Sequence, residues 1–282
     1  MNPLIICAAV TGGAPARSKS PHHPVTPHEV AEAAVACWRA GAAMVHLHAR
    51  REDGSTTMDL ADYRETVDRI TATGCDAIIN LSAGDNGGRA DHTQRLSIAE
   101  SGADMVSLDA GSFNIGERLY DNRPSYLREM ATRMKALGIR PEVELFDLGH
   151  FHFLQTLVSE GLLSAPAYIQ FVFGAPGALP PDVRLLPLLL EHLPSGAQWA
   201  VSAQTGDHQK HLALEMCAFT QDGHVRTGME DYVHVRPGEL AKTNAEMVEQ
   251  WVATAQIWGR PVASPETARH MLGIKHVQRS TV

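Results

Sequence analysis

A short apolar stretch of the chain contains two histidines separated by one residue, His46-Leu47-His48. Side chains of a β-strand alternate between its two faces, so both imidazoles point to one face and Leu47 points to the other. Two imidazole nitrogens on one face can bind one metal, with a carboxylate as third ligand and a fourth position left for substrate. Hydrogen-bonded core histidines are the alternative. A nearby acidic residue therefore favours a site for zinc or another divalent ion.

Glu230 and Asp231 are the candidate carboxylates, at the end of the run 224–231. If residues 224–231 form the last strand of a closed barrel, they pair with the first strand. The first strand also neighbours the strand that carries His46 and His48, so Glu230 can approach the two histidines. Alternation along the run places Arg226, Gly228 and Glu230 on one face. This arrangement favours Glu230 as the third protein ligand.

Two other histidine pairs follow later strands and compete for a metal role. His150 and His152 would splay apart on a helix, because residues two apart lie on different faces. His208 and His211 share a helix face, but the preceding residues 205–207 are typical of an exposed helix start. We therefore expect solvated or capping roles for both pairs.

Further polar residues end or follow other apolar runs. Ser82 offers a hydroxyl to a substrate, or a local hydrogen bond, and Gly84 lets the loop backbone approach a carboxylate. Glu142 and Glu144 share one face of a strand that has no solvent-exposed side. They are expected to pair with a buried cation such as Arg226, either in support of catalysis or as a structural ion pair.

The elements that position these residues follow a repeated pattern. Short runs rich in Val, Ile and Leu alternate with longer segments of helical periodicity, which indicates βα units with a parallel sheet. An open doubly wound sheet would alternate in the same way, but no G-x-G-x-x-G follows the first strand. The pattern predicts an α/β fold, a (β/α)8 TIM barrel, with strands in residues 4–11, 43–50, 76–83, 104–111, 141–147, 167–174, 198–206 and 224–231.

Helix boundaries are also visible in the sequence. Thr26-Pro27 followed by Glu29 is a capping-box pattern, and Gly41 is expected to end that helix. Ser264-Pro265 predicts the start of an extra C-terminal helix. We expect residues 1–282 to form a single TIM-barrel domain.

Composition restricts the partners and the compartment. The chain of 282 residues is 44% hydrophobic, which is ample for one large core, and its net charge of −8 without a basic run argues against nucleic-acid or anionic-membrane binding. The partners are expected to be small molecules. Four scattered cysteines without a C-x-x-C pair suit reduced thiols in the cytoplasm. The N-terminal stretch has neither a signal-peptide nor a membrane-anchor pattern.

Several motifs together resemble one enzyme family. The runs are TPHEVAEAAVACWRAGAAMVHLHAR, NLSAG, SLDAGSFN, PEVELFD, FVFGAPG, HVRTGMED and RPVASPETARHMLGI. In this order they resemble the β-keto acid cleavage enzyme family, whose archetype is the 3-keto-5-aminohexanoate cleavage enzyme. The resemblance implies a zinc TIM barrel that condenses a β-keto acid with acetyl-CoA and splits the adduct into acetoacetate and a new acyl-CoA. It also implies a homo-oligomer, with a tetramer expected.

The same resemblance assigns roles to individual residues. Its implied metal ligands are His46, His48 and Glu230. Its implied catalytic group is Ser82, Arg226 and Asp231, in which the aspartate helps to deprotonate the keto acid, with Glu144 or Glu142 supporting the arginine. The substrate-binding residues that we expect are Ser82, Gly84, Ser107 and Asn114.

One departure from the archetype bears on the substrate. The archetype has an acidic residue for the substrate's amino group in the loop after the first strand, where this chain has Ala14. A cationic substrate is therefore not expected. Arg17, Lys19 and Arg89 favour an anionic or neutral β-keto acid or meet CoA phosphates, unless they are solvated surface charges.

Two other functions remain as alternatives. A metal-dependent TIM-barrel hydrolase also uses an H-x-H pair, but there the pair is expected on the first strand, with histidines ending the fifth and sixth strands. Here the first strand ends in Thr11-Gly12 and the sixth in Phe173-Gly174. A non-catalytic barrel that binds a metal or metabolite is the third possibility.

Overall fold

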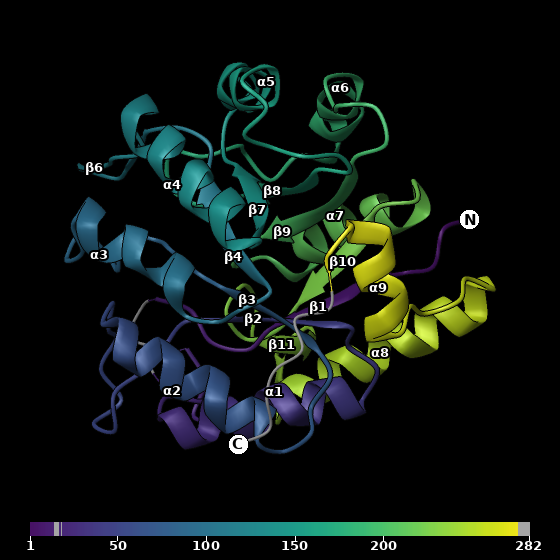
Figure 1. The fold of residues 1–282 in the computed structure, drawn as a ribbon. Coiled ribbons are helices and arrows are strands. Elements are labelled where there is room, and N and C mark those ends of the chain that lie inside the picture. Colours follow the sequence, from purple (N-terminus) through teal and green to yellow (C-terminus); the bar gives the residue numbers. More distant parts are fainter. Residues whose placement is uncertain (14–16, 18, 276–282) are drawn as a thin grey trace.

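Eight parallel strands close into a barrel in the computed structural model, which describes residues 1–13, 17 and 19–275. Around the barrel the order is β1, β10, β9, β8, β7, β4, β3, β2, and helices surround it (Figure 1). The predicted TIM barrel is thus confirmed. The barrel strands are β1 (Ile6–Ala9), β2 (Met44–Leu47), β3 (Ile78–Leu81), β4 (Met105–Asp109), β7 (Arg140–Leu145), β8 (Tyr168–Phe173), β9 (Gln198–Ala203) and β10 (His224–Thr227).

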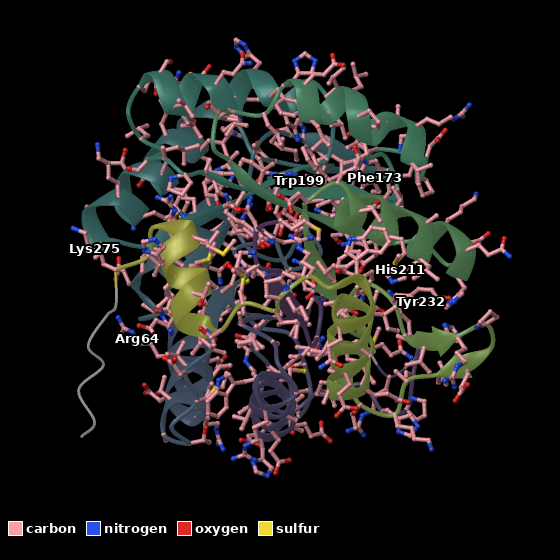
Figure 2. The ribbon with its side chains drawn as sticks, turned by 90° about the vertical axis from the view of Figure 1, so that its right-hand side faces the viewer. Arg64, Phe173, Trp199, His211, Tyr232 and Lys275 are labelled. Atoms are coloured by element: carbon pink, nitrogen blue, oxygen red, sulfur yellow. The ribbon has the colours of Figure 1, made fainter. Side chains whose placement is uncertain are left out.

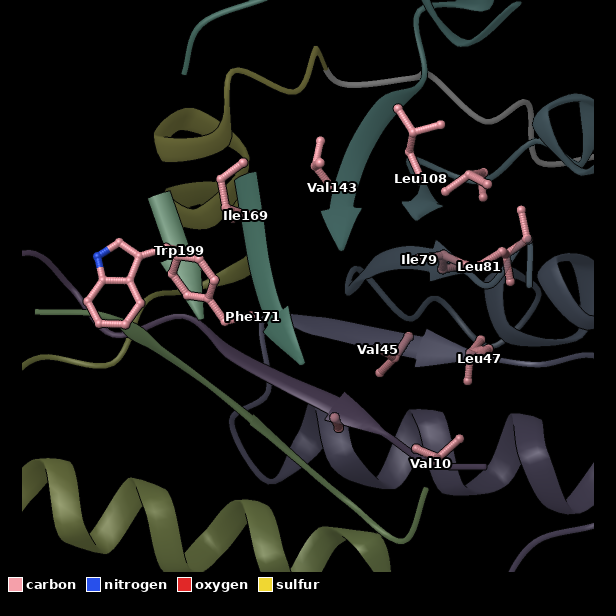
Figure 3. Close-up of a cluster of buried hydrophobic side chains, with 14 of the residues drawn as sticks. Val10, Val45, Leu47, Ile79, Leu81, Leu108, Val143, Ile169, Phe171 and Trp199 are labelled. Atoms are coloured by element: carbon pink, nitrogen blue, oxygen red, sulfur yellow. The ribbon is translucent and has the colours of Figure 1, made fainter. Parts of the chain in front are cut away.

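Alternation along the strands divides the core into two parts. Val45 and Leu47 of β2 point outward, into a large apolar layer between the barrel and the helices that also contains Ile79 and Leu81 (Figure 3). The other face of β2 points into the barrel, where Met44 packs in a second cluster. Complete burial of each such side chain contributes about 1.5–3 kcal/mol. The two apolar layers hold each strand in register.

The C-terminal helix closes the lower end of the barrel. Ala268 and Leu272 of α9 (Pro265–Leu272) belong to the same interior cluster as Ile5 and Met44. Ser264 caps this helix by accepting the N–H of Thr267 at 3.1 Å. The expected extra C-terminal helix is confirmed, and it leaves the carboxyl ends of the strands as the open side of the barrel.

The remaining helices follow from local signals. Thr26 and Glu29 form the predicted capping box at the start of α1, and Asp207 caps α7 by accepting two backbone N–H groups. None of the helices in the described part of the chain is long and apolar enough to cross a membrane. The helical segments are α1 (Pro27–Arg39), α2 (Leu60–Thr71), α3 (His92–Ser97), η1 (Ile98–Glu100), α4 (Pro124–Leu137), α5 (His150–Ser159), η2 (Val183–Leu185), α6 (Leu186–Glu191), α7 (His208–Thr220) and α8 (Asn244–Trp258).

Two antiparallel hairpins were not expected from the sequence. The first consists of β5 (Phe113–Ile115) and β6 (Arg118–Tyr120), after β4. The second consists of β11 (His234–Arg236) and β12 (Glu239–Leu240), after β10. Both are inserted at the carboxyl ends of barrel strands, so they extend the side of the barrel where catalytic residues of this fold lie.

Candidate active site

The three predicted metal ligands meet at the carboxyl end of the barrel. The Nε2 atoms of His46 and His48 lie 3.8 Å and 3.4 Å from Oε1 of Glu230. One potential ligand atom from each residue falls within 4.8 Å of the others. The Oε2 atom of Glu230 is buried and has no hydrogen-bond partner among the described residues. A metal ion between these atoms would give that oxygen a partner, so the residues fit a metal centre.

Glycines of the loop after β1 pack directly on these ligands. A Cβ atom at Gly12 would lie 2.9 Å from Cγ of Glu230, and one at Gly13 would lie 3.2 Å from the imidazole of His48. Arg50, itself buried, donates hydrogen bonds to the carbonyl of Gly12 and the hydroxyl of Thr11. The loop backbone therefore closes over the ligands without side chains of its own.

Glu230 and Asp231 lie in a turn, which corrects the expectation that the last strand continues through them. The strand β10 ends at Thr227, and Gly228 adopts a φ of +135°. The N–H groups of Asp231 and Tyr232 both donate to the carbonyl of Gly228. Strict alternation would send Glu230 and Asp231 to opposite faces, whereas the turn brings both carboxylates to the same arginine.

That arginine, Arg226, is the centre of a buried charge network. Its Nε lies 2.8 Å from Oδ2 of Asp231, and its Nη2 lies 2.8 Å from Oε1 of Glu230. Its Nη1 is 3.7 Å from Glu144 and 4.0 Å from Glu142. The expected pairing of the strand glutamates with Arg226 is therefore confirmed, at longer range than the pairing with Asp231 and Glu230.

The electrostatics suit metal binding. Burial raises the pKa of Glu230, but Arg226 and the two histidines outweigh it and hold that pKa well below its usual range. Burial lowers the pKa of His48 despite the opposing charge of Glu230. A carboxylate and a neutral imidazole are the protonation states that bind a metal. In contrast, burial together with Asp109 and Glu142 raises the pKa of Glu144.

The expected substrate-binding residues divide into two groups. Ser82 and Gly84 line the same cavity of about 390 Å³ as the metal ligands and Arg226. The Ser82 hydroxyl accepts the N–H of Gly84 at 3.2 Å. Ser107 is buried and accepts the N–H of Ala83 at 2.9 Å, and Asn114 is exposed on β5. Ser107 and Asn114 are not among the cavity-lining residues, so their predicted contact with substrate stays a prediction.

Other cavity residues were missed from the sequence. Asp109 ends β4 and accepts a hydrogen bond from the Tyr120 hydroxyl, and its strand-end position was the one available signal. Arg118 and Tyr120 come from the β5–β6 hairpin, which no local pattern indicated. Arg118 forms an ion pair with Asp85 across the cavity rim.

The competing histidines lie outside this centre, but not all of them are solvated. His152 is exposed, as expected. His150 is buried, and its Nδ1 accepts the N–H of Phe146. His211 is also buried, with Nδ1 2.9 Å from the carbonyl of Ala203 and its ring stacked on Tyr232 at 4.3 Å between centroids (Figure 2). The expectation of a solvated or capping role was wrong for His150 and His211, because both side chains are buried. The ring of Tyr232 covers His211.

Known proteins resemble the chain over nearly its whole length. Residues 3–274 match the family model described as beta-keto acid cleavage enzyme. The chain is 38% identical over 291 residues to the 3-dehydrocarnitine:acetyl-CoA trimethylamine transferase of Rhizobium meliloti (strain 1021), covering 95% of this chain and 96% of that protein. It is 34% identical over 276 residues to the 3-keto-5-aminohexanoate cleavage enzyme of Fusobacterium nucleatum subsp. nucleatum, covering 98% and 99%.

Solved structures agree with the fold. The apo structure of ObcA superposes with a TM-score of 0.78 at 20% sequence identity and covers 92% of this chain. The present chain spans 66% of the length of ObcA. At this identity the similarity concerns the barrel architecture alone.

Proposed function

The chain belongs to the β-keto acid cleavage enzyme family, and we propose that it is a metal-dependent β-keto acid:acetyl-CoA C-acetyltransferase. The reaction converts a β-keto acid and acetyl-CoA into acetoacetate and a new acyl-CoA. The observation that carries this proposal is the meeting of His46, His48 and Glu230 with Arg226 in one cavity. Arg226 is in turn ion-paired with the buried Asp231.

The bonds exchanged in this reaction balance without a further reactant. The α-carbon of the keto acid loses a proton and forms a bond to the acetyl carbon of acetyl-CoA, whose bond to sulfur breaks. The CoA sulfur forms a bond to the original keto carbon, the bond between that carbon and the α-carbon breaks, and the α-carbon regains a proton. The chain must therefore remove a proton from carbon and hold two carbonyl compounds together.

His46, His48 and Glu230 are the residues that would hold the metal. Two nitrogens and one carboxylate oxygen are a common ligand set for catalytic zinc, which makes zinc our choice over other divalent ions. When bound, such an ion supplies a Lewis acid that polarises the keto oxygen and acidifies the α-proton.

Asp231 is the proposed base for the α-proton. Arg226 donates to both of its oxygens, at 2.8 Å and 3.3 Å, which orients the carboxylate. Ser82 and Gly84 line the same cavity and are proposed to bind the keto acid carboxylate. Glu144 holds Arg226 from the side of β7, 3.7 Å away.

The test is turnover of a panel of β-keto acids with acetyl-CoA labelled with ¹³C in both acetyl carbons. We expect acetoacetate labelled at C3 and C4, together with the acyl-CoA of each accepted substrate, measured by mass spectrometry. No turnover by metal-replete protein across a broad panel would refute the proposal, as would CoA-independent hydrolysis of an ester, amide or lactone.

Metal analysis tests the ligand assignment separately. We expect His46→Ala and Glu230→Ala to lose bound zinc, while His152→Ala, on the exposed face of α5, retains it. Full metal retention in both site variants would overturn the assignment. Inductively coupled plasma mass spectrometry of the purified proteins gives the metal content directly.

We also propose a substrate class, an oligomeric state, a compartment and a domain organisation. A β-keto acid with a neutral or anionic side chain is the substrate class that we propose, since Ala14 offers no charge for a cationic group. The family resemblance favours a homotetramer, and the four free cysteines favour the cytoplasm. We propose that residues 1–282 act as one domain.

A further inference from the structure

Two cations line the active-site cavity without an acidic partner in the described part of the chain. Lys19 comes from the loop after β1 and Arg89 from the loop after β3, and both line the cavity that contains His46, His48 and Glu230. Both residues are exposed. Arg89 donates to the hydroxyl of Thr56 at 3.2 Å, which holds its guanidinium but does not neutralise it.

The acidic residues of the cavity are already engaged. Asp85 pairs with Arg118, and Glu230 pairs with Arg226. Asp109 accepts from the Tyr120 hydroxyl and lies 3.4 Å from Arg95.

Glu144 is the remaining acid of the cavity lining. Its Oε1 lies 3.7 Å from Nη1 of Arg226, so this acid is engaged as well. The charges of Lys19 and Arg89 are therefore not cancelled by the cavity wall. A cavity with such an excess attracts an anionic group of its ligand.

The size of the cavity indicates which ligand carries this anionic group, the keto acid or CoA. Its volume of about 390 Å³ is near the small end of the range of roughly 300–1,000 Å³ for ligand pockets. A six-carbon keto acid fits such a volume together with an acetyl group. The phosphates of CoA are separated from its thioester by the long pantetheine arm, so they are expected beyond this cavity.

We propose that Lys19 and Arg89 form a subsite for a carboxylate at the far end of the keto acid. The preferred substrates are then β-keto dicarboxylic acids, whose first carboxylate and keto group face His46, His48 and Glu230. This inference rests on the proposed function, because it names the substrate class of the same site. It assigns the choice of substrate to two loop residues outside the metal-binding and Arg226 networks.

The kinetic test compares two substrates of equal length. They are 3-oxohexanedioate, which has the distal carboxylate, and 3-oxohexanoate, which ends in a methyl group. We expect wild type to prefer the dicarboxylate by about tenfold or more in kcat/KM, since one charge-assisted contact has this effect. In the double variant K19A/R89A the preference should disappear through a higher KM for the dicarboxylate, with the constants for 3-oxohexanoate unchanged.

Arg17→Ala is the matched control. Arg17 belongs to the same loop as Lys19, but it pairs with Glu29 at 2.7 Å and lines a different pocket. We expect this variant to retain the preference for 3-oxohexanedioate. Equal use of both substrates by wild type, or equal loss of the preference in Arg17→Ala, would refute the subsite.

Two further measurements separate the possible causes of failure. A higher KM for acetyl-CoA in K19A/R89A, with the dicarboxylate preference intact, would assign the two cations to CoA phosphates and overturn the proposal. Calorimetric binding of unreactive hexanedioate and hexanoate reports on the subsite without turnover. If no keto acid reacts but hexanedioate binding depends on Lys19 and Arg89, the proposed function fails and the subsite stands. Equal binding of hexanedioate and hexanoate refutes the subsite.

Discussion

The Nδ1 atom of His46 lies 3.2 Å from Oε2 of Glu142, and both side chains are fully buried inside the barrel. The two residues come from β2 and β7, which are not neighbours in the barrel. The amide Nδ2 of Asn80 lies 3.1 Å from the same Nδ1. When Nδ1 carries the ring proton, Glu142 is the acceptor on this side and Nε2 is left for a metal. This contact therefore fixes the ring of a proposed metal ligand from behind.

Replacing Glu142 with Gln should weaken metal binding without removing a ligand. The amide is a weaker acceptor for the His46 N–H, so we expect metal affinity to fall by about 10- to 100-fold. Competition with a chromophoric chelator measures this change. Glu215→Gln is the matched control, because Glu215 is equally buried on α7 but does not approach His46 as Glu142 does. The same loss in both variants would contradict a specific role for Glu142.

Replacing Asp231 with Asn should remove the proposed base and leave the metal bound. Asn retains an oxygen for Arg226 but cannot accept the α-proton, so we expect kcat to fall by about 10²- to 10⁴-fold. Exchange of the α-protons of the keto acid in D₂O, followed by NMR without acetyl-CoA, isolates this step. Asp182→Asn removes a surface carboxylate paired with Arg184 and serves as control. Undiminished exchange in Asp231→Asn would exclude Asp231 as the base.

Replacing Gly228 with Ala should damage both the fold and the site. A Cβ at this position would lie 2.2 Å from the carbonyl oxygen of Ala9, which also accepts the N–H of Glu230. Gly238 also has a positive φ, of 76°, but a Cβ there meets nothing within 4 Å.

The two glycine variants therefore separate backbone strain from collision. We expect Gly238→Ala to cost about 1 kcal/mol in the free energy of unfolding, and Gly228→Ala to cost more and to lose metal. Urea denaturation and metal analysis compare the two variants. Equal stability with full metal content in both would mean that the turn at Gly228 is not required.

Acid should destabilise the protein through His224. Its Nδ1 accepts the N–H of Ile5, and burial together with Arg260 lowers its pKa from 6.5 to about 3. Between these values the unfolded chain binds a proton that the folded chain does not, so the free energy of unfolding decreases as pH falls from 6.5 toward 3. The contribution reaches about 1.4 kcal/mol per pH unit in this window.

Denaturation of metal-free protein at pH 7, 6, 5 and 4 measures this dependence. His224→Asn keeps an acceptor near the position of Nδ1 but does not titrate, so we expect its stability to fall less steeply below pH 6.5. His152→Ala removes an exposed histidine and should follow the wild-type curve. Parallel curves for wild type and His224→Asn would exclude His224 as a source of acid sensitivity.

Local sequence patterns determined the framework of this protein. Strand runs, the capping box of Thr26 and Glu29 and the helix start at Ser264 depend on periods of two and 3.6 residues and on neighbours within one turn. The placement of His46 and His48 on one face is also a local feature, because strand alternation alone puts residues two apart on the same side. These features were therefore predictable.

Contacts between distant segments decided the rest. The 3.2 Å approach of His46 and Glu142 crosses the barrel interior, and the burial of His211 under Tyr232 depends on how α7 meets the turn after β10. The β5–β6 hairpin supplies Tyr120 and Arg118 to the cavity without a local signal. Closure of the barrel brings these residues together across long stretches of chain, and no short-range periodicity encodes such distances.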